Sequence, residues 1–517
     1  MDKIQLLWAD DEIELLKPHI LFLNDKGYEV SIARSGDEAL DALKEKDFDA
    51  VLLDENMPGL SGLETLSQIK AMRSALPVIM ITKSEEEHIM EDAIGSKIAD
   101  YLIKPVNPHQ ILLSLKKTLD NKRLISVKTN TGYRKEFQQI GMTIGDNLSP
   151  TEWTEVYKKL VYWELEIDKS GDKSMIEVLR MQKSEANAQF FKFIEKKYIN
   201  WLNGKDASAP TMSHTLIKNK VAGELDKNPI TFLLVIDNLR YDQWKMIEPI
   251  ITEYYKVDQE DLFFSILPSA TQYARNALFA GLLPSEIEKR FPNLWLNDEE
   301  EGGKNMHEEE LLQAQLKRLG KDVKMSYNKI TNIAAGKKLS ENISNLSQNK
   351  LNVIVYNFVD MLSHARTDME VIRELADDEP AYRSLTVSWF EHSALLDIIK
   401  QIADRKARLI ITTDHGTIHV KEPSKVVGDR NVNTNLRYKQ GKTLDYNKKD
   451  VFEVRNPSDA FLPKQHVSTC FIFAKEDKFF AYPNNYNHYV NYYRNTFQHG
   501  GISLEEMIIP YITLSPK

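Results

Sequence analysis

Cysteine is nearly absent from this sequence: the 517 residues include one, Cys470. A single cysteine excludes an intrachain disulfide and any zinc finger built from several thiolates, and it suits a reducing cytoplasm. No apolar run approaches the length needed to span a membrane, and the N-terminal residues lack a signal-peptide pattern. We therefore expect a cytoplasmic protein without a membrane span.

Positive charge is also in short supply, with 67 Lys and Arg against 76 Asp and Glu and a formal net charge of -9. This balance does not favour general binding to a phosphate backbone, although a local patch could still bind nucleic acid. No segment joins a basic recognition helix to a tight glycine turn, so we expect no direct DNA-binding motif. The length allows two or three domains.

Residues 1–123 contain five repeats of an apolar strand followed by an amphipathic helix. The expected strands are 4–9, 28–33, 50–54, 77–82 and 100–104. Such alternation predicts a parallel sheet covered by helices on both faces, with its functional crevice at the carboxyl ends of the strands.

Polar residues follow four of these strands at that edge. They are Asp10, Asp11, Asp54, Thr82 and Lys104. Any one of them alone would be read as a polar strand cap. Carboxylates gathered together repel one another unless a hard cation joins them, and oxygen ligands suit Mg²⁺. A carboxylate neutralised in this way can attack a phosphoryl group.

This segment resembles the receiver domains of bacterial response regulators, including "DENMPGLSG" after Asp54 and "KP" at 104–105. The resemblance implies a flavodoxin-like fold with Asp54 as the phosphoacceptor and with Asp10, Asp11 and Asp54 holding Mg²⁺. It further implies Thr82 as a switch hydroxyl, with Tyr101 as its aromatic partner. Lys83 departs from the small residue usual after the switch hydroxyl, so the rates of phosphorylation and dephosphorylation are open.

The strand-helix pattern stops at residue 124, and residues 124–228 show a helical pattern instead. Two segments, 149–170 and 174–202, carry aromatic and aliphatic residues at helical spacing with charges between them. Ser149-Pro150 predicts a helix start, and Gly171 and Gly204 predict helix ends. We expect a helical-bundle connector whose aromatic stripe forms core or partner surface.

From residue 229 to 517 the strand-helix pattern returns, in the runs 230–237, 351–360, 407–415, 470–477 and 506–514. Aspartates stand at the ends of three of these runs, Asp237, Asp360 and Asp414, and we expect them along one edge of one sheet. His364, His415 and His499 accompany them. An acidic run at 297–310 reads as a solvated loop.

Three aspartates and three histidines are enough ligands for two zinc ions. Two such ions can stabilise the attacking and leaving oxygens of phosphoryl transfer. Thr271 supplies a hydroxyl nucleophile, which needs a metal or a base to activate it. Taken singly, each of these residues would be a surface or cap residue.

The segment 229–517 resembles the alkaline phosphatase superfamily. The resemblance implies one zinc held by Asp237, Thr271, Asp414 and His415, and another held by Asp360, His364 and His499. It also implies that Thr271 is the nucleophile, as in the phosphodiesterase branch, and that an asparagine holds a phosphate oxygen, for which Asn293 is the nearest candidate. Arg275 is an alternative phosphate clamp.

The whole architecture is α/β and resembles response regulators of the PorX type, in which a receiver and a helical connector precede a PglZ-type domain. That resemblance implies a sensor histidine kinase as phosphodonor and a link to type IX secretion. We expect a zinc-dependent phosphodiesterase, acting on nucleotide-type diesters and controlled by Asp54 phosphorylation, in a phosphorylation-dependent homodimer. The alternative is a zinc-bound docking module for secretion or transcription machinery.

Overall fold

The structure is a computed structural model. It describes residues 4–73, 76–83, 98–145, 147–298, 300–357, 359–362, 378–428 and 433–517, without the side chains of 120–128, 130 and 173. The chain divides into two compact units, one comprising residues 1–138 and 163–178 and the other 139–162 and 179–517. None of the helices in the described parts is long and apolar enough to cross a membrane.

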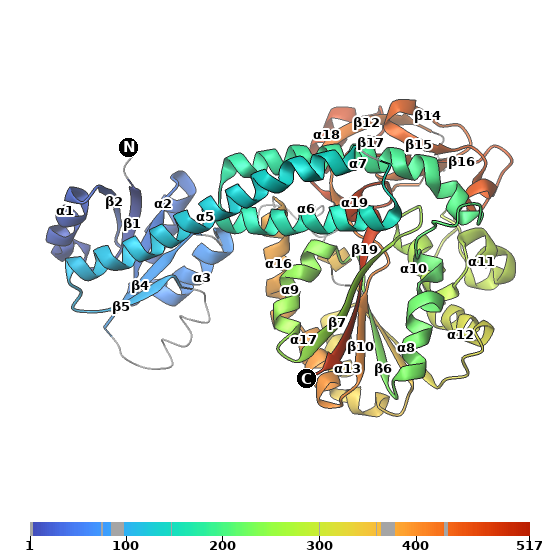
Figure 1. The fold of residues 1–517 in the computed structure, drawn as a ribbon, viewed down its shortest axis with the longest axis horizontal. Coiled ribbons are helices and arrows are strands. Elements are labelled where there is room, and N and C mark those ends of the chain that lie inside the picture. The colour runs from blue at the N-terminus through green and yellow to red at the C-terminus, as the bar shows by residue number, and fades with distance from the viewer. Residues whose placement is uncertain are drawn as a thin grey trace. The chain divides into compact units, whose positions relative to one another are not determined.

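The first unit contains a parallel five-stranded sheet in the order β2-β1-β3-β4-β5 (Figure 1). Its strands are β1 (Ile4–Ala9), β2 (Tyr28–Ala33), β3 (Ala50–Asp54), β4 (Val78–Thr82) and β5 (Asp100–Ile103). The described helices between them are α1 (Lys17–Asp25), α2 (Gly36–Glu45) and α3 (Gly62–Met72). This strand order is that of flavodoxin-like folds, so the predicted fold class is confirmed here.

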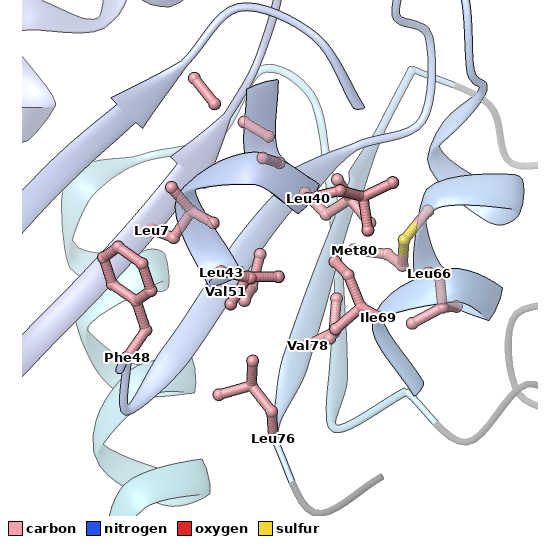
Figure 2. Packing of buried hydrophobic residues seen from close by; sticks show 14 residues of the cluster. Leu7, Leu40, Leu43, Phe48, Val51, Leu66, Ile69, Leu76, Val78 and Met80 are labelled. Carbon is pink, nitrogen blue, oxygen red and sulfur yellow. The ribbon is translucent and has the colours of Figure 1, made fainter. Parts of the chain in front are cut away.

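Alternation along β3 explains how the receiver sheet has two cores. Val51 and Leu53 belong to one buried cluster with Leu40 and Leu66 from the helices (Figure 2). The residues between them, such as Leu52, belong to a second cluster on the other face of the sheet. Because side chains alternate along a strand, a run that is apolar at every position must be buried on both faces.

Three long helices follow: α5 (Pro108–Ile144), α6 (Pro150–Ser170) and α7 (Lys173–Leu202). The start of α6 is capped reciprocally, since Ser149 Oγ accepts from the Glu152 amide at 3.3 Å and the Ser149 amide donates to the Glu152 carboxylate at 2.7 Å. Gly171 and Gly204 have φ of 67° and 64°, the left-handed conformation that ends helices. The boundary proposed at 123/124 falls inside α5.

The second unit contains a six-stranded sheet in the order β7-β19-β10-β6-β9-β8. Its strands are β6 (Thr231–Ile236), β7 (Tyr255–Phe264), β8 (Met325–Ile330), β9 (Leu351–Tyr356), β10 (Arg408–Thr412) and β19 (Ile508–Pro516). Strands β10, β6, β9 and β8 are parallel, whereas β19 runs antiparallel to β10 and β7. Asp237, Asp360 and Asp414 therefore follow three adjacent parallel strands, as expected.

Helices flank this sheet (Figure 1). On one side lie α9 (Tyr241–Ile251), α16 (Glu379–His392) and α17 (Ala394–Asp404), and on the other α8 (Ala222–Lys227), α10 (Thr271–Ala280) and α12 (Glu308–Arg318). The strand predicted at 470–477 forms as β16 (Cys470–Ala474), but in a separate antiparallel sheet between β13 (Tyr438–Gly441) and β15 (Val451–Val454).

Candidate functional site

The receiver strands bring three carboxylates together. Asp10, Asp11 and Asp54 can each offer one oxygen such that all three oxygens lie within 4.8 Å of one another. Asp10 and Asp54 are buried, whereas Asp11 is exposed. The site therefore combines two fixed carboxylates with one that is open to solvent, an arrangement into which a hydrated cation fits.

Lys104 completes this pocket. Its Nζ lies 2.9 Å from Asp10 Oδ2 and 3.0 Å from Asp54 Oδ1. Burial raises the pKa of Asp54 to about 6 and repulsion from Asp10 and Asp11 adds to the rise, while Lys104 opposes it. A carboxylate whose ionised form is disfavoured in this way gains from a divalent cation beside it.

Thr82 ends β4 and is buried, and its hydroxyl donates to the Glu55 carboxylate next to Asp54. Tyr101 on β5 is half-buried and pairs with Met80 in the neighbouring strand. Lys83 is exposed and lies 3.4 Å from Glu12 Oε2. The sequence-predicted receiver residues thus lie at or beside one sheet edge.

In the second unit, Asp237, Asp414 and His415 form a buried cluster in which one donor atom from each lies within 4.8 Å of the others. Asp237 follows β6 and Asp414 follows β10, and these strands pair in parallel, so their carboxyl ends coincide. Burial raises the pKa of Asp237 well above its usual range. The positive charge of Arg275 opposes this rise, and the negative charges of Asp414 and Asp360 add to it. Burial acts the same way on Asp414, but His415 and Arg275 outweigh it and lower the pKa of that carboxyl.

Both histidines present the same ring nitrogen to carboxylates. His415 Nδ1 lies 3.1 Å from the Gly416 carbonyl oxygen, and His499 Nδ1 lies 3.2 Å from the Ser269 carbonyl oxygen. A carbonyl accepts, so each Nδ1 carries a proton, and a neutral ring then has its lone pair on Nε2. His415 Nε2 faces Asp237 Oδ1 and Asp414 Oδ2, both at 3.7 Å. This is the orientation found in metal-binding histidines.

Asp360 and His499 lie beside this cluster. His499 Nε2 is 3.6 Å from Asp360 Oδ1, and the His499 ring stacks on the His415 ring with centroids 4.2 Å apart. Asn238 Nδ2 donates to Asp360 Oδ1 at 3.4 Å. His364, the remaining expected ligand, lies outside the described residues.

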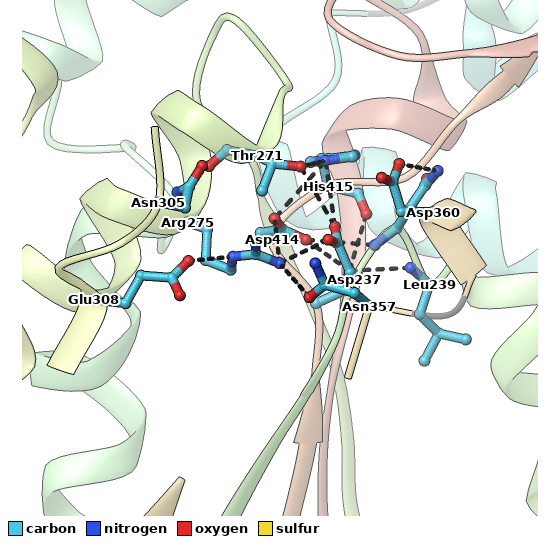
Figure 3. A network of polar contacts seen from close by, with 12 residues as sticks. Asp237, Leu239, Thr271, Arg275, Asn305, Glu308, Asn357, Asp360, Asp414 and His415 are labelled. Carbon is cyan, nitrogen blue, oxygen red and sulfur yellow. Dashed lines mark hydrogen bonds and ion pairs between the residues drawn. The ribbon is translucent and has the colours of Figure 1, made fainter. Parts of the chain in front are cut away.

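Thr271 is the first residue of α10, and its hydroxyl points into the cluster (Figure 3). Thr271 Oγ1 is 3.0 Å from His415 Nε2 and 3.5 Å from Asp237 Oδ1. The N-terminus of a helix carries partial positive charge and unpaired amides, which favour an anion there. The hydroxyl therefore lies where a phosphate group would be stabilised.

Arg275 is one turn further along α10 and is 1% exposed. Its guanidinium contacts Asp237 Oδ2 at 2.7 Å and Glu308 Oε1 at 2.6 Å (Figure 3). Arg275 therefore fixes Oδ2 of Asp237, whereas the Thr271 hydroxyl faces Oδ1. Asn293, the other expected clamp, is exposed in a short 3-10 helix (Pro292–Leu294), and none of its side-chain contacts among the described residues reaches the cluster.

The prediction that residues 297–310 form a solvated loop is wrong for Glu308. Its side chain is 1% exposed at the start of α12 and also contacts Lys329 Nζ at 2.9 Å. Ser269 is another residue without a sequence signal: its hydroxyl donates to the Gly501 carbonyl at 2.9 Å and accepts from the Gly500 amide at 3.2 Å. Only spatial proximity to His499 reveals its part in the site.

The cluster fits a metal. Asp414 Oδ2 is buried and accepts no hydrogen bond from the described residues, although buried acceptors are nearly always paired. Two buried carboxylates and an imidazole lone pair also converge at one place, where Arg275 is the fixed positive charge among the described residues. Mixed nitrogen and oxygen donors of this kind suit zinc.

Three family models match the chain in succession. A response regulator receiver domain matches residues 6–116, a PorX response regulator linker domain matches 123–202, and a BREX system PglZ alkaline phosphatase-like domain matches 216–514. The last match covers more than half of the chain. This protein belongs to the PglZ alkaline phosphatase-like family. The predicted order of receiver, PorX-type linker and PglZ domain is confirmed.

Curated proteins with a similar segment include two transcriptional regulators that match about a quarter of this chain. The transcriptional regulatory protein ZraR of Escherichia coli strain K12 is 33% identical over 140 residues, which are 27% of this chain and 32% of ZraR. ResD of Bacillus subtilis strain 168 is 32% identical over 118 residues, 23% of this chain and 49% of ResD. The chain thus spans between a third and a half of the length of these relatives.

Among solved structures, a CheY-like receiver domain protein from Methanospirillum hungatei JF-1 is 28% identical. The similarity covers 23% of this chain and 95% of that one, with a TM-score of 0.23. A receiver domain protein from Clostridium thermocellum is 29% identical over 23% of this chain and 98% of that one, also with a TM-score of 0.23. A receiver domain implies a phosphodonor such as a histidine kinase.

Proposed function

We propose that this PglZ-family protein is a two-component response regulator in which phosphorylation of Asp54 controls a zinc-dependent phosphodiesterase. A sensor histidine kinase supplies the phosphoryl group. Asp10, Asp11 and Asp54 hold Mg²⁺, and Lys104 and Thr82 contact the phosphoryl oxygens. The fixed contacts of Lys104 with both Asp10 and Asp54 support this assignment, because they place a cation at the position where negative charge increases.

The observation that carries the enzymatic half of the proposal is the position of the Thr271 hydroxyl, 3.0 Å from His415 Nε2 within a buried group of metal-type donors. A structural threonine at a helix start would turn its hydroxyl to a backbone group. Here the hydroxyl instead faces a histidine lone pair and a carboxylate. Such a location is suited to a nucleophile whose proton is readily lost.

Asp237, Asp414, His415 and Thr271 would hold one zinc ion, and Asp360, His499 and His364 the other. When bound, the two ions supply Lewis acidity that lowers the pKa of a hydroxyl and stabilises charge on phosphoryl oxygens. The assignment of His364 rests on resemblance alone.

The residues themselves account for the rest of the chemistry. Thr271 Oγ gives up its proton to water and forms a bond to phosphorus while the bond from phosphorus to the leaving alkoxide breaks, and the alkoxide takes up a proton. Water then forms a bond to phosphorus as the bond to Thr271 Oγ breaks, which restores the threonine hydroxyl. The N-terminus of α10 stabilises the added negative charge. Arg275 and Glu308 keep Asp237 fixed, and the Gly416 and Ser269 carbonyls keep both histidines in the tautomer with a free Nε2.

Diesters are favoured over monoesters because the sequence offers no cluster of arginines for a doubly charged phosphate, and nucleotide-type diesters are the proposed class. By resemblance to PorX-type regulators, the protein acts in type IX secretion. Phosphorylation is proposed to drive two-fold dimerisation through local rearrangement at Thr82 and Tyr101. Secretion or transcription machinery would then be a further partner, in the cytoplasm.

The test is to measure zinc content and the hydrolysis of a bis-aryl phosphate and an aryl monophosphate by the purified full chain. Thr271→Val should lower the rate of diester hydrolysis at least about a thousandfold, because the nucleophile is lost, and the variant should still fold. Thr331→Val, at an exposed position of the same unit, is the matched control. Equal rates for both variants would contradict the nucleophile assignment.

A second arm of the same experiment adds acetyl phosphate and Mg²⁺ to wild type and to Asp54→Asn. A change in rate or oligomeric state in wild type alone would support control through Asp54. Zinc at full occupancy without turnover of either ester would instead favour a docking module, and absence of zinc would contradict the ligand assignment.

A further inference from the structure

Helix α7 contacts two loops that carry residues of the candidate zinc site. One loop leads from β7 to Thr271, and the other runs from His499 to the short helix α19 (Leu504–Met507). Residues 173–178 of α7 belong to the unit that contains the receiver, and residues 179–202 belong to the unit that contains the zinc site. The contacts below all lie within the second unit.

Asn187 binds the start of α19. Its Oδ1 accepts from the Leu504 amide at 2.8 Å, and its Nδ2 donates to Glu505 Oε2 at 3.1 Å. The Leu504 amide is one of the helix-start donors that lack a partner within the helix, so Asn187 caps α19 from another element. Lys183, one turn earlier on α7, contacts Glu505 Oε1 at 3.3 Å. Asn187 and Glu505 are each 5% exposed, so loss of these bonds would leave buried polar groups unpaired.

The position of α19 determines the position of His415. The Gly416 amide donates to the Glu506 carbonyl oxygen at 3.1 Å, and a Cβ on Gly416 would lie 2.0 Å from the Glu505 carbonyl oxygen. The backbone that follows His415 is therefore pressed against α19. The Gly416 carbonyl in turn accepts from His415 Nδ1. The groups that orient this ring therefore lie in direct contact with α19.

The same short helix also fixes the loop after His499. Glu506 Oε1 accepts from the Gly501 amide at 2.9 Å, and Arg437 forms a buried two-bond pair with the Glu506 carboxylate at 3.0 and 2.7 Å. His499 is two residues from this anchor. Its ring orientation thus depends on α19 as well as on Ser269.

Tyr198, about three turns beyond Asn187 on α7, holds the other loop. Its hydroxyl oxygen accepts from the Leu267 amide at 2.7 Å, and the side chain is 1% exposed. Leu267 precedes Thr271 by four residues, and Ser269 lies between them with its bonds to Gly500 and Gly501. Through these bonds α7 supports the nucleophile segment and the His499 loop together.

We propose that Asn187 and Tyr198 are positioning residues of the zinc site: Asn187 sets the positions of His415 and His499 through α19, and Tyr198 sets that of Thr271 through Leu267. This inference rests on the proposed function and adds to it the element that supports the site. Outer partners of metal ligands affect metal affinity or activity by about 10- to 100-fold.

The experiment loads the full chain with zinc and follows its transfer to a colorimetric chelator, alongside diester hydrolysis. Asn187→Ala should release zinc about tenfold faster and lower kcat about tenfold. Tyr198→Phe should lower kcat severalfold with a smaller effect on zinc release, because it acts on the side of Thr271. Asn200→Ala, an exposed asparagine on the same helix, is the matched control and should behave as wild type.

Glu505→Gln gives a graded test, because glutamine keeps an oxygen that accepts from Asn187 Nδ2 but loses the charge that Lys183 contacts. It should fall between wild type and Asn187→Ala in zinc release, and it carries the test together with Tyr198→Phe if Asn187→Ala does not fold. A merely structural role would lower melting temperature without changing zinc release. Zinc release and kcat equal to those of Asn200→Ala would overturn this inference alone, whereas a wild-type protein without zinc would overturn the proposed function.

Discussion

The two polar pockets of this protein lie at the same kind of place, the carboxyl ends of adjacent parallel strands, yet they differ in access and in donor atoms. In the receiver, the three candidate ligands are all carboxylates and Asp11 is exposed. In the PglZ domain, Asp237, Asp414 and His415 are all buried, and one of them supplies nitrogen. An open set of oxygen donors suits a hydrated ion that exchanges, and a buried mixed set suits an ion that stays.

The fixed cations of the two pockets differ in the same way. Lys104 Nζ contacts an oxygen of Asp54, the proposed phosphoacceptor, so it is placed to contact a phosphoryl group there. Arg275 instead lies between Asp237 and Glu308, with 1% of its side chain exposed. In the proposed function, Lys104 would take part in the chemistry, whereas Arg275 would hold the metal ligand Asp237 in place. Four substitutions would test this contrast.

The largest expected effect is that of Gly416→Ala. The added Cβ would meet the Glu505 carbonyl oxygen at 2.0 Å, so the backbone beside His415 must move. Misplacement by about 1 Å can cost about a hundredfold in rate, and we expect at least that loss of diester hydrolysis together with weaker zinc binding. Gly223→Ala, in an exposed helical position with open space around it, is the matched control and should be neutral or slightly stabilising. Equal kcat in both variants would show that this backbone contact does not position the site.

Arg275→Met is expected to act mainly on stability. It leaves the carboxylates of Asp237 and Glu308 buried without their shared partner, and removing one member of such a group costs about 3–5 kcal/mol. Urea denaturation of the zinc-free protein should show this loss, and added zinc should recover part of it by neutralising Asp237. In Arg275→Met/Glu308→Gln the loss should be smaller. A raised KM for the diester with unchanged stability would instead identify Arg275 as the phosphate clamp.

Strand ends were predictable from the sequence because parallel neighbours such as β6 and β10 place their last residues at one edge. Asp237 and Asp414 could be brought together on this basis alone. The partners that orient them could not. Glu308 lies in an acidic run whose pattern resembles a solvated loop, and its burial depends on pairing with Arg275 far away in the sequence. Ser269 and Asn187 act through single hydrogen bonds that leave no periodic pattern.

A third prediction concerns protons and Mg²⁺ in the receiver. The pKa of Asp54 is raised to about 6, chiefly by burial. Without metal, protonation of Asp54 therefore stabilises the folded receiver, and this stabilisation is lost as the pH rises from about 4 through 6. Mg²⁺ binds the ionised form. Its stabilising effect on the receiver should therefore be small at pH 5 and grow to a shift of several degrees at pH 7.5, as measured by thermal melting of the full chain. Asp54→Asn should remove most of this pH dependence, and an effect of Mg²⁺ that is equal at both pH values would contradict it.

The smallest effect is expected at Lys83, where a long basic side chain follows the switch hydroxyl. Its contact with Glu12 is 3.4 Å long and both side chains are at least half exposed, so Lys83→Ala should change the free energy of unfolding by less than about 1 kcal/mol. A small residue there would open the approach of water to Asp54, and we expect the phosphoryl group to be lost severalfold faster. Glu12→Ala removes the same ion pair but leaves the lysine chain in place, so its phosphoryl lifetime should stay near that of wild type. If both variants shortened the lifetime equally, the ion pair rather than the bulk of Lys83 would protect the phosphoryl group, and the receiver pocket would be less open than its exposed Asp11 suggests.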